Sequence, residues 1–332
     1  MMNQIPPLPE WFKTILLNSD ATQVWSAISD YVLNKAKQPY NPLELHRSLL
    51  SLDRTLAEAA WELWERFPEA APRTAEFLQD WWLKNANGVH GRAVLIVDAL
   101  SLRELPLLLD LFEQKQVVPR NIKATAAEVP TDTDSFATAL GLAGRAKLNE
   151  PFLSLSFLLS SHDIFTAVLN QPFADCIPLL LPRRDIVVWH DWLDVHLHAH
   201  SHNASAFERI VHDGLTGRGA ENFWTLIEKL RQGRRLLITS DHGYANTTRF
   251  AHDEFDGPTR EYLQKNLHAS RVYRVTDEAT KNFMPPLLLT RNKSHVALGQ
   301  RTWKVQGSYP EVCHGGLSLL EAFVPFIELA ER

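Results

Sequence analysis

The sequence predicts an α/β protein in which a mostly parallel sheet, flanked by helices, follows a helical N-terminal region. Up to about residue 85 the apolar residues recur every three or four positions, a spacing typical of amphipathic helices. Beyond that point, short continuous apolar runs alternate with helical patterns, which favours parallel strands covered by helices on both faces. We therefore expect a helical region at residues 1–88 and an α/β domain at residues 89–332.

The N-terminal region shows helical spacing in "PLELHRSLLSLDRTLAEAAWELWERF", and we expect its prolines to lie between helices. It contains no cluster of polar groups suited to chemistry. Its tryptophans are predicted to be core or interface residues, because large aromatic side chains are mostly buried. They are Trp61, Trp64, Trp81 and Trp82.

The α/β domain has four apolar runs of strand length, "RAVLIVDAL", "RDIVVWHDW", "RRLLITSDHG" and "MPPLLLTRN". Helical stretches such as "SLRELPLLLDLFEQK" and "GAENFWTLIEKLRQ" lie between them. Ligands of parallel sheets bind at the carboxyl ends of the strands, so we expect the chemistry there.

The charge balance gives no general reason for tight binding to nucleic acid or an anionic membrane, since 34 basic and 39 acidic residues leave a formal charge of -5. We expect nucleic acid only as a substrate. Two cysteines, Cys176 and Cys313, are too few for a disulfide framework and are predicted to be free thiols. Neither a secretion signal nor a membrane-spanning run is found, so we expect a cytoplasmic location.

Two strands end in acidic residues. Asp98 closes the first run, and Asp241 with His242 closes the third. A carboxylate at a strand's carboxyl end can hold a cation, although Asp98 also fits the N-cap of a helix beginning near Ser101. Asp241 and His242 can both bind a divalent metal, and Gly243 would let the backbone turn away sharply.

The segment "VPTDTDSFATAL", between the two strand-end acids in the sequence, contains the candidate hydroxyl, that of Thr133. Thr133 stands just before a helical run, where its hydroxyl would lie at the positive end of the helix dipole, which favours both an alkoxide and a phosphate. The simpler interpretation is that Thr133 is the N-cap of that helix.

Two later segments add further metal-binding groups. Asp194 and His198 in "WHDWLDVHLHAH" are four residues apart, so a helix would place them on one face, where they could hold one metal. His314 in "CHGGLSLLEAFVPF" precedes two glycines, on a loop that can approach a site closely. The alternative for the segment with Asp194 and His198 is a solvent-exposed histidine loop. The alternative for His314 is an ordinary turn histidine.

Together these residues supply three carboxylates, three imidazoles and a hydroxyl, enough for two metal sites. Two divalent cations about 4 Å apart can activate a nucleophile, hold a phosphoryl oxygen and stabilise the leaving group. We expect one site to contain Asp98, Asp241, His242 and the Thr133 oxygen, and the other to contain Asp194, His198 and His314.

The order of these segments resembles the alkaline phosphatase superfamily. The spelling "LIVDAL", "VPTDTDS", "ITSDHGY" and "HGGLSLLEAFVPF" is most similar to the PglZ domain of bacterial phage-defence proteins (BREX and phage growth limitation), from about Arg92 to Leu329. The resemblance implies an alkaline phosphatase-like fold and a two-metal, usually zinc, phosphatase or phosphodiesterase, with manganese as the other candidate metal. It also implies that Thr133 is the nucleophile, with Thr131 as the competing choice, and that the other six residues are metal ligands.

The resemblance leaves three assignments open. Relatives often carry an arginine three residues after the strand-end aspartate, where this chain has Ser101 and the nearest arginine is Arg103. Basic residues that could line a route to the metals, or could simply be solvated, are Arg145, Lys147, Arg291 and Lys293. Histidines that could replace His198 are His190, His196, His200 and His202.

The expected function is hydrolysis of a phosphodiester, such as an oligonucleotide or cyclic nucleotide, with a role in phage defence. Attack by Thr133 would give a phosphothreonine that water then hydrolyses. The alternative is a metal-stabilised, weakly active or non-catalytic interaction module of a bacterial defence complex, with other defence proteins as partners. A sulfatase is excluded because the chain has no C/S-x-P-x-R motif.

Overall fold

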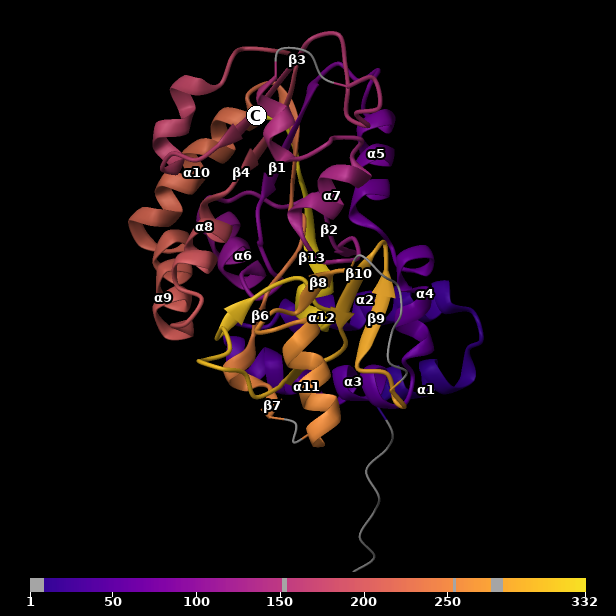
Figure 1. Ribbon diagram of the computed structural model, residues 1–332. Coiled ribbons are helices and arrows are strands. Elements are labelled where there is room, and N and C mark those ends of the chain that lie inside the picture. The colour runs from indigo at the N-terminus through magenta and orange to yellow at the C-terminus, as the bar shows by residue number, and fades with distance from the viewer. Residues whose placement is uncertain (1–8, 151–153, 253–254, 276–282) are drawn as a thin grey trace, which may run out of the picture.

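The computed structural model describes residues 9–150, 154–252, 255–275 and 283–332, and its centre is a six-stranded sheet in the order β2-β13-β5-β1-β4-β3 (Figure 1). β5, β1, β4 and β3 are parallel neighbours, and β13 runs antiparallel between β5 and β2. The expected mostly parallel sheet is confirmed. The strands are β1 (Gly91–Val97), β2 (Asn121–Ala126), β3 (Ile164–Leu169), β4 (Asp185–His190), β5 (Arg234–Thr239) and β13 (Phe323–Leu329).

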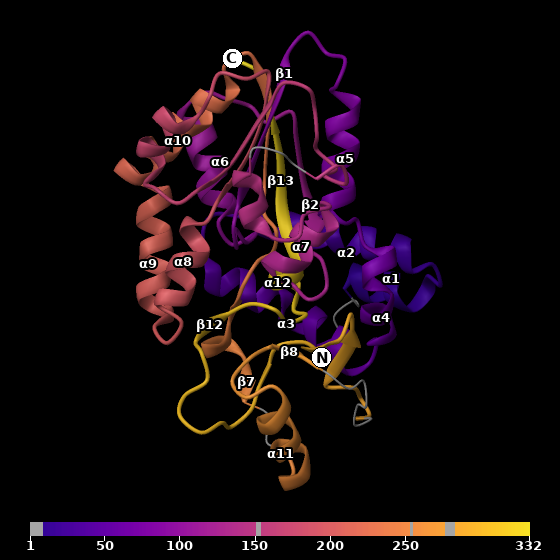
Figure 2. The ribbon, with the colours of Figure 1, turned by 45° about the horizontal axis from the view of Figure 1, so that its top comes forward.

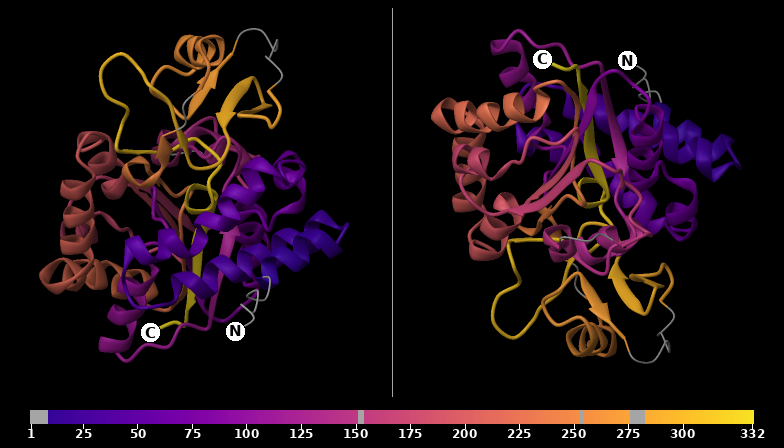
Figure 3. Two further views of the ribbon diagram at one scale, coloured as in Figure 1. Left: turned by 90° about the horizontal axis from the view of Figure 1, so that it is seen from below. Right: turned by 90° about the horizontal axis from the view of Figure 1, so that it is seen from above.

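Helices cover both faces of this sheet (Figure 3). One face carries α6 (Leu105–Gln114), α8 (Trp192–Ala199), α9 (Ala204–Leu215) and α10 (Gly217–Arg231), and the other carries α5 (Thr74–Lys84) and α7 (Thr133–Ala139). Short 3-10 helices are η1 (Arg145–Asn149), η2 (Phe173–Leu179) and η3 (Thr247–Arg249).

The central strand β1 shows why most of its sequence is apolar. All seven of its residues are buried. Alternate side chains point to opposite faces of a strand, so Leu95 and Val97 join the core beneath α6 and α10, whereas Val94 and Ile96 join the core beneath α5 and α7. Its one charged side chain, Arg92, lies near the start of the strand and pairs with the buried Asp185.

The N-terminal helices share their core with the sheet. Trp25 contacts Trp64, Phe67 and, on β13, Phe323, with ring centroids 4.8, 4.7 and 6.0 Å apart. Trp64, Trp81 and Trp82 are buried, as expected, and Trp61 is partly exposed. These helices are α1 (Glu10–Leu17), α2 (Ala21–Ala36), α3 (Pro42–Glu58) and α4 (Glu62–Ala70).

The expectation that prolines lie between these helices is wrong for Pro68, which lies inside α4. A proline inside a helix removes one backbone donor. Here the helix ends two residues later, at Ala70, so little of it is disturbed.

A smaller unit stands at the carboxyl end of the parallel strands (Figure 2). It contains α11 (Gly257–Asn266) and an antiparallel sheet of β8 (Val272–Arg274), β10 (Ser294–Ala297) and β9 (Leu288–Arg291). The run "MPPLLLTRN" therefore supplies β9 to this sheet rather than a strand to the parallel sheet, which corrects the expectation. β9 is only partly buried and turns directly into β10, so it forms a hairpin instead of a covered central strand.

Short elements connect this unit to the main sheet: β6 (Ala245–Asn246), β7 (Ala251–His252), β11 (Arg301–Thr302), β12 (Val312–Cys313) and α12 (Leu319–Ala322). The two cysteines are free, as predicted. Among the described residues, no helix is both long enough and apolar enough to cross a membrane.

Candidate metal centre

Asp98 follows β1 directly and its side chain is fully buried. Its Oδ2 accepts a hydrogen bond from Trp189 Nε1 at 3.1 Å and also pairs with the Arg145 guanidinium. The next helix, α6, begins only at Leu105 and its N-cap is Glu104. The N-cap interpretation of Asp98 is therefore wrong.

Asp241 and His242 follow β5 and lie beside Asp98. Asp241 Oδ1 accepts hydrogen bonds from Ala99 N (3.1 Å) and Ser240 Oγ (3.2 Å), which leaves Oδ2 facing His242 Nε2 at 3.3 Å. His242 Nδ1 lies 3.0 Å from the Gly243 carbonyl oxygen. A carbonyl can only accept, so in the neutral ring Nδ1 carries the proton and the Nε2 lone pair faces the two carboxylates.

Gly243 is needed for a close approach rather than for a sharp turn. Its φ is not positive, and a Cβ atom there would lie 2.2 Å from the Leu320 carbonyl oxygen. The expectation that the glycine lets the backbone turn away is corrected: it lets the strand end pack against the segment that follows His314.

Thr133 Oγ1 lies at the centre of this group. It is 2.9 Å from Asp241 Oδ2, 3.3 and 3.5 Å from the two Asp98 oxygens, and 3.4 Å from His242 Nε2. Thr133 is the first residue of α7, whose N-cap is Asp132, bonded to Ser135 N at 2.8 Å. The N-cap interpretation of Thr133 is wrong, and its hydroxyl faces the carboxylates instead.

Thr131 is used differently. Its fully buried hydroxyl donates to the Gly316 carbonyl oxygen at 2.8 Å and accepts from Gly315 N at 3.1 Å. Its side chain therefore fixes the His-Gly-Gly loop and does not face the acidic group.

The second group lies on α8 and the His-Gly-Gly loop. Asp194 Oδ1 is 3.3 Å from His198 Nε2 and 3.7 Å from His314 Nε2, and the two Nε2 atoms are 3.4 Å apart. His314 Nδ1 lies 3.2 Å from the Thr131 carbonyl oxygen, which leaves the Nε2 lone pair free in the neutral ring. Asp194 Oδ1 is buried, and no hydrogen bond to it from a described residue is found.

The neighbouring histidines have other contacts. His190 Nδ1 accepts from Trp192 N at 3.1 Å, and its Nε2 lies 3.0 Å from the Gln171 carbonyl oxygen. His196 contacts the Trp192 ring, and His200 Nδ1 contacts the His196 carbonyl oxygen. His202 contacts Ser308 Oγ. None of these four histidines takes the place of His198 beside Asp194 and His314.

The two groups adjoin each other. The rings of His242 and His314 stack with centroids 4.2 Å apart and an interplanar angle of 17°. Burial raises the pKa of Asp98, and the neighbouring Asp241 raises it further. Burial also lowers the pKa of His314 to about 4, and the nearby His242 adds to that effect.

The residues present fit two divalent cations. In each group the carboxylate oxygens and imidazole nitrogens lie within 4.8 Å of one another, although no ion is part of this structure. Buried carboxylates that face each other, and a buried oxygen without a donor, are both stabilised by a cation. Mixed oxygen and imidazole ligands suit zinc or manganese.

Two side chains at the site were not assigned from the sequence. Arg145, which the sequence left among the solvated candidates, pairs with Asp98, and Trp189 donates to the same carboxylate. The alternative Arg103 instead contacts the Tyr244 carbonyl oxygen and lies over the Tyr244 ring. The remaining basic candidates pair with Glu150 and Glu69 or line a separate cavity; they are Lys147, Arg291 and Lys293.

A mostly parallel sheet with two Asp/His groups and a hydroxyl at its carboxyl edge is the arrangement that the resemblance to the alkaline phosphatase superfamily implied. Residues 167–329 match the model of the family described as the BREX system PglZ alkaline phosphatase-like domain. This part of the chain therefore matches the PglZ family, as the resemblance implied. At the coarse level of the superfamily, the match identifies a phosphoester hydrolase of a group that uses two divalent metals.

Solved structures with a similar course of the chain have low sequence identity to it. Murine ectonucleotide pyrophosphatase / phosphodiesterase 5 is 13% identical, with 72% of this chain and 88% of that chain covered and a TM-score of 0.48. The human protein is 14% identical, with 72% of this chain and 88% of that chain covered and a TM-score of 0.45. Phosphonoacetate hydrolase from Sinorhizobium meliloti is 12% identical, with 74% of this chain and 91% of that chain covered and a TM-score of 0.39. Comparison with curated proteins found no match.

Proposed function

We propose that the chain is a two-metal phosphodiesterase or phosphatase, with zinc or manganese, and that Thr133 is its nucleophile. The observation that carries the proposal is the position of Thr133 Oγ1, between 2.9 and 3.5 Å from ligand atoms of Asp98, Asp241 and His242. The competing Thr131 hydroxyl is already bonded to Gly315 and Gly316. One metal would be held by Asp98, Asp241 and His242, and the other by Asp194, His198 and His314.

The chemistry follows from the hydroxyl. Bound divalent cations would lower the pKa of the Thr133 hydroxyl and stabilise the charge that develops on the phosphoryl oxygens. Thr133 Oγ1 gives up its proton to solvent and attacks phosphorus, so the new O–P bond forms as the bond to the leaving oxygen breaks. The leaving oxygen takes up a proton from solvent and departs as an alcohol. Water then attacks the same phosphorus and restores the Thr133 hydroxyl, which donates to Asp241 Oδ2 in the resting structure.

Arg145 is the proposed cation for the substrate phosphate. Its side chain is 26% exposed, so it can reach a ligand, and its only described acidic partner within salt-bridge distance is Asp98. With Asp98 committed to a metal, the planar guanidinium is free to bind two phosphate oxygens. This would replace the arginine that relatives carry where this chain has Ser101.

The preferred substrate is a phosphodiester such as an oligonucleotide or cyclic nucleotide, and the proposed role is in phage defence, with other defence proteins as partners. The description of the matched family as a BREX system domain supports the proposed defence role. In the same proposal, residues 1–88 form a helical layer on the domain of residues 89–332. Ser29 Oγ, which donates to the Ala124 carbonyl oxygen at 3.0 Å, links the two, and residues 1–8 lie outside the described residues.

The test is hydrolysis of bis(p-nitrophenyl) phosphate with zinc or manganese by the wild type and by Thr133→Ala. The turnover number should fall roughly 10³-fold or more, because the nucleophile is removed. The control is Thr225→Ala, the same change at an exposed position of α10 whose hydroxyl only bonds Glu221 O. Unchanged activity in Thr133→Ala would overturn the nucleophile assignment.

Metal analysis completes the test. The wild type should bind two equivalents of metal per chain, and Asp241→Asn or His314→Ala should each lose one. A wild type that binds both metals and hydrolyses neither a diester nor a monoester would favour the alternative of a non-catalytic interaction module.

A further inference from the structure

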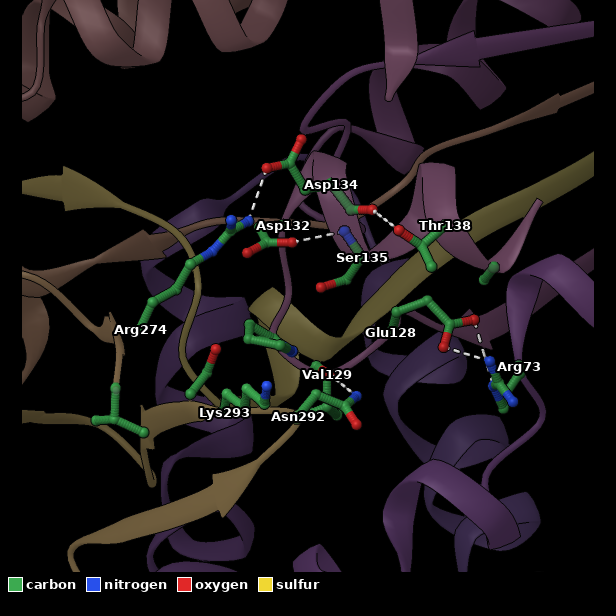
Figure 4. A pocket seen from close by; sticks show the side chains of 14 residues that line it. Arg73, Glu128, Val129, Asp132, Asp134, Ser135, Thr138, Arg274, Asn292 and Lys293 are labelled. Carbon is green, nitrogen blue, oxygen red and sulfur yellow. Dashed lines mark hydrogen bonds and ion pairs between the residues drawn. The ribbon is translucent and has the colours of Figure 1, made fainter. Parts of the chain in front are cut away.

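Two cavities of the described chain differ in how their arginines are paired. The larger, of about 610 Å³, adjoins α7 (Figure 4), and its arginines have acidic partners, because Arg73 pairs with Glu128 and Arg274 pairs with Asp134. The smaller, of about 410 Å³, lies between the N-terminal helices and the segment that joins β1 to α6. Its buried arginine has no acidic partner within salt-bridge distance in the described chain, so this cavity is the candidate ligand site.

Two parts of the chain line this smaller cavity. Most of the lining comes from the end of α2 and the start of α3, between Lys35 and Ser48. Arg103 and Pro106 complete it from the segment that follows β1. None of the seven candidate site residues lines it, although Asp98 lies only five positions before Arg103. The cavity is therefore separate from the candidate metal centre and forms where the N-terminal helices pack on the α/β domain.

The Arg103 side chain is buried with part of its hydrogen-bonding capacity unused. The residue is 2% exposed, and its Nη1 donates to the Tyr244 carbonyl oxygen and, at 3.2 Å, to Ser101 Oγ. Neither its Nε nor its Nη2 has an acceptor among the described residues, and Nε is fully buried. Unused donors on a buried guanidinium are costly, so an acceptor in the adjoining space would stabilise them.

The acids around Arg103 have other partners. The two carboxylate oxygens of Glu104 accept hydrogen bonds from a tyrosine hydroxyl at 2.7 Å and a backbone amide at 3.0 Å. Burial raises the pKa of Glu104 to about 7, so this carboxylate is only partly ionised near neutral pH. Glu208 pairs with Arg249, and Glu44, the one acid in the cavity lining, is exposed. Arg103 therefore keeps a positive charge that no direct ion pair offsets.

Two further donors line the cavity with Arg103. Lys35 Nζ lies 5.4 Å from the centroid of the Tyr31 ring, and no acid of the described chain lies within salt-bridge distance of it. The Tyr40 hydroxyl has no hydrogen bond to a described residue, and burial raises its pKa, so it keeps its proton. Two cations and a neutral hydroxyl thus surround one space with donors and no matching acceptor.

We propose that this cavity binds the phosphate group of a small molecule through Arg103, Lys35 and Tyr40. A phosphate offers three oxygens to these three side chains, whereas a carboxylate offers two. The volume of about 410 Å³ lies within the range of small-molecule sites. The phosphate can be inorganic or part of a mononucleotide. This second ligand site does not depend on the proposed hydrolysis, and it gives the N-terminal helices a binding role.

The test is equilibrium dialysis of the metal-loaded chain against radiolabelled inorganic phosphate near neutral pH. The wild type should bind phosphate both at the metal centre and in the cavity. Affinity for the cavity should fall roughly tenfold in Lys35→Gln, which removes a charged donor, and roughly threefold in Tyr40→Phe, which removes a neutral one. Both side chains are partly exposed, so the variants should fold. The control is Lys37→Gln, an exposed lysine of the same segment that does not line the cavity.

Removal of the metals with EDTA isolates the cavity. The wild type should then still bind one phosphate per chain, and the two variants should bind it more weakly by the same factors. Thymidine 5′-monophosphate distinguishes the sources: tighter binding than phosphate identifies a mononucleotide, and equal or weaker binding identifies inorganic phosphate.

Three results would overturn the inference: no phosphate binding in EDTA, an affinity unchanged in both variants, or equally tight binding of acetate. Absence of hydrolysis of every substrate by the metal-loaded wild type would overturn the proposed function instead. Phosphate binding in EDTA would be unaffected by that result, so the two failures are distinguishable.

Discussion

Asp53 links the N-terminal helices to the metal centre and should make stability depend on pH. It lies on α3, is fully buried, and accepts hydrogen bonds from Leu319 N at 2.9 Å and Gln300 Nε2 at 2.6 Å. Leu319 begins α12, directly after the loop that carries His314. Burial raises the pKa of Asp53 from 3.8 to about 7; nearby Glu321 also raises it, while the two hydrogen bonds and Arg271 lower it.

The sign and size of the effect follow from that pKa. Below the unfolded pKa of 3.8, Asp53 is protonated in both states and costs nothing. As the pH rises towards about 7, only the unfolded chain ionises, so the free energy of unfolding falls. A difference of about 3 pKa units at 1.36 kcal/mol each amounts to about 4 kcal/mol, fully developed above the folded pKa.

The perturbation is Asp53→Asn, which keeps an acceptor for Leu319 N and cannot ionise. Other buried acids, such as Glu104, titrate in both proteins, so the measured quantity is the difference between variant and wild type. Urea unfolding at several pH values should show this difference moving in favour of the variant by about 4 kcal/mol between about pH 4 and pH 8. A difference that stays constant within about 1 kcal/mol would refute the reasoning.

Three further changes test how the centre is held. Glu321→Gln should lower the free energy of unfolding by about 3–5 kcal/mol, because it leaves the fully buried Arg271 without its charge partner at 2.8 Å; Glu58→Gln, from an exposed pair with Arg54, should change it by less than about 0.5 kcal/mol and is the control. Trp189→Phe keeps the ring contact with Phe136 but removes the donor to Asp98 Oδ2, so zinc affinity in a chelator competition should fall roughly 10- to 100-fold; an unchanged affinity would show that this bond does not orient the carboxylate. Gly243→Ala should cost about 1–3 kcal/mol in urea unfolding, since its Cβ would lie 2.2 Å from the Leu320 carbonyl oxygen. Gly257→Ala, where no atom lies within 4 Å of the new Cβ, should be tolerated, and equal losses in the two would contradict the close-packing argument.

The convergence of Asp98, Asp241 and His242 could be predicted from the sequence. Continuously apolar runs indicate parallel strands, and parallel strands end at the same edge of a sheet, so residues that close such runs must meet there. Asp98 and Asp241 are close for this reason, although 142 positions separate Ala99 from its bonded partner Asp241. The four-residue spacing of Asp194 and His198 likewise needed only the helical period.

The choice between similar side chains depended on tertiary contacts. Thr131 and Thr133 are two residues apart and chemically alike, yet Thr131 is bonded to Gly315 and Gly316, 184 and 185 positions later. His190 resembles His198 in sequence, but its ring is fixed by backbone groups. The partners of Thr131 come from a distant segment, and no local pattern encodes them.

By itself, the sequence determined the sheet type, the helical N-terminal region and the set of groups at the strand ends, because periodicity and strand polarity are local properties that parallel topology carries into three dimensions. Only the tertiary structure decided that Arg145 and Trp189 contact Asp98, that β9 belongs to the smaller sheet, and that Gly243 serves a close contact. Each of these depends on which distant backbone lies alongside, and that is set by the packing of the whole chain.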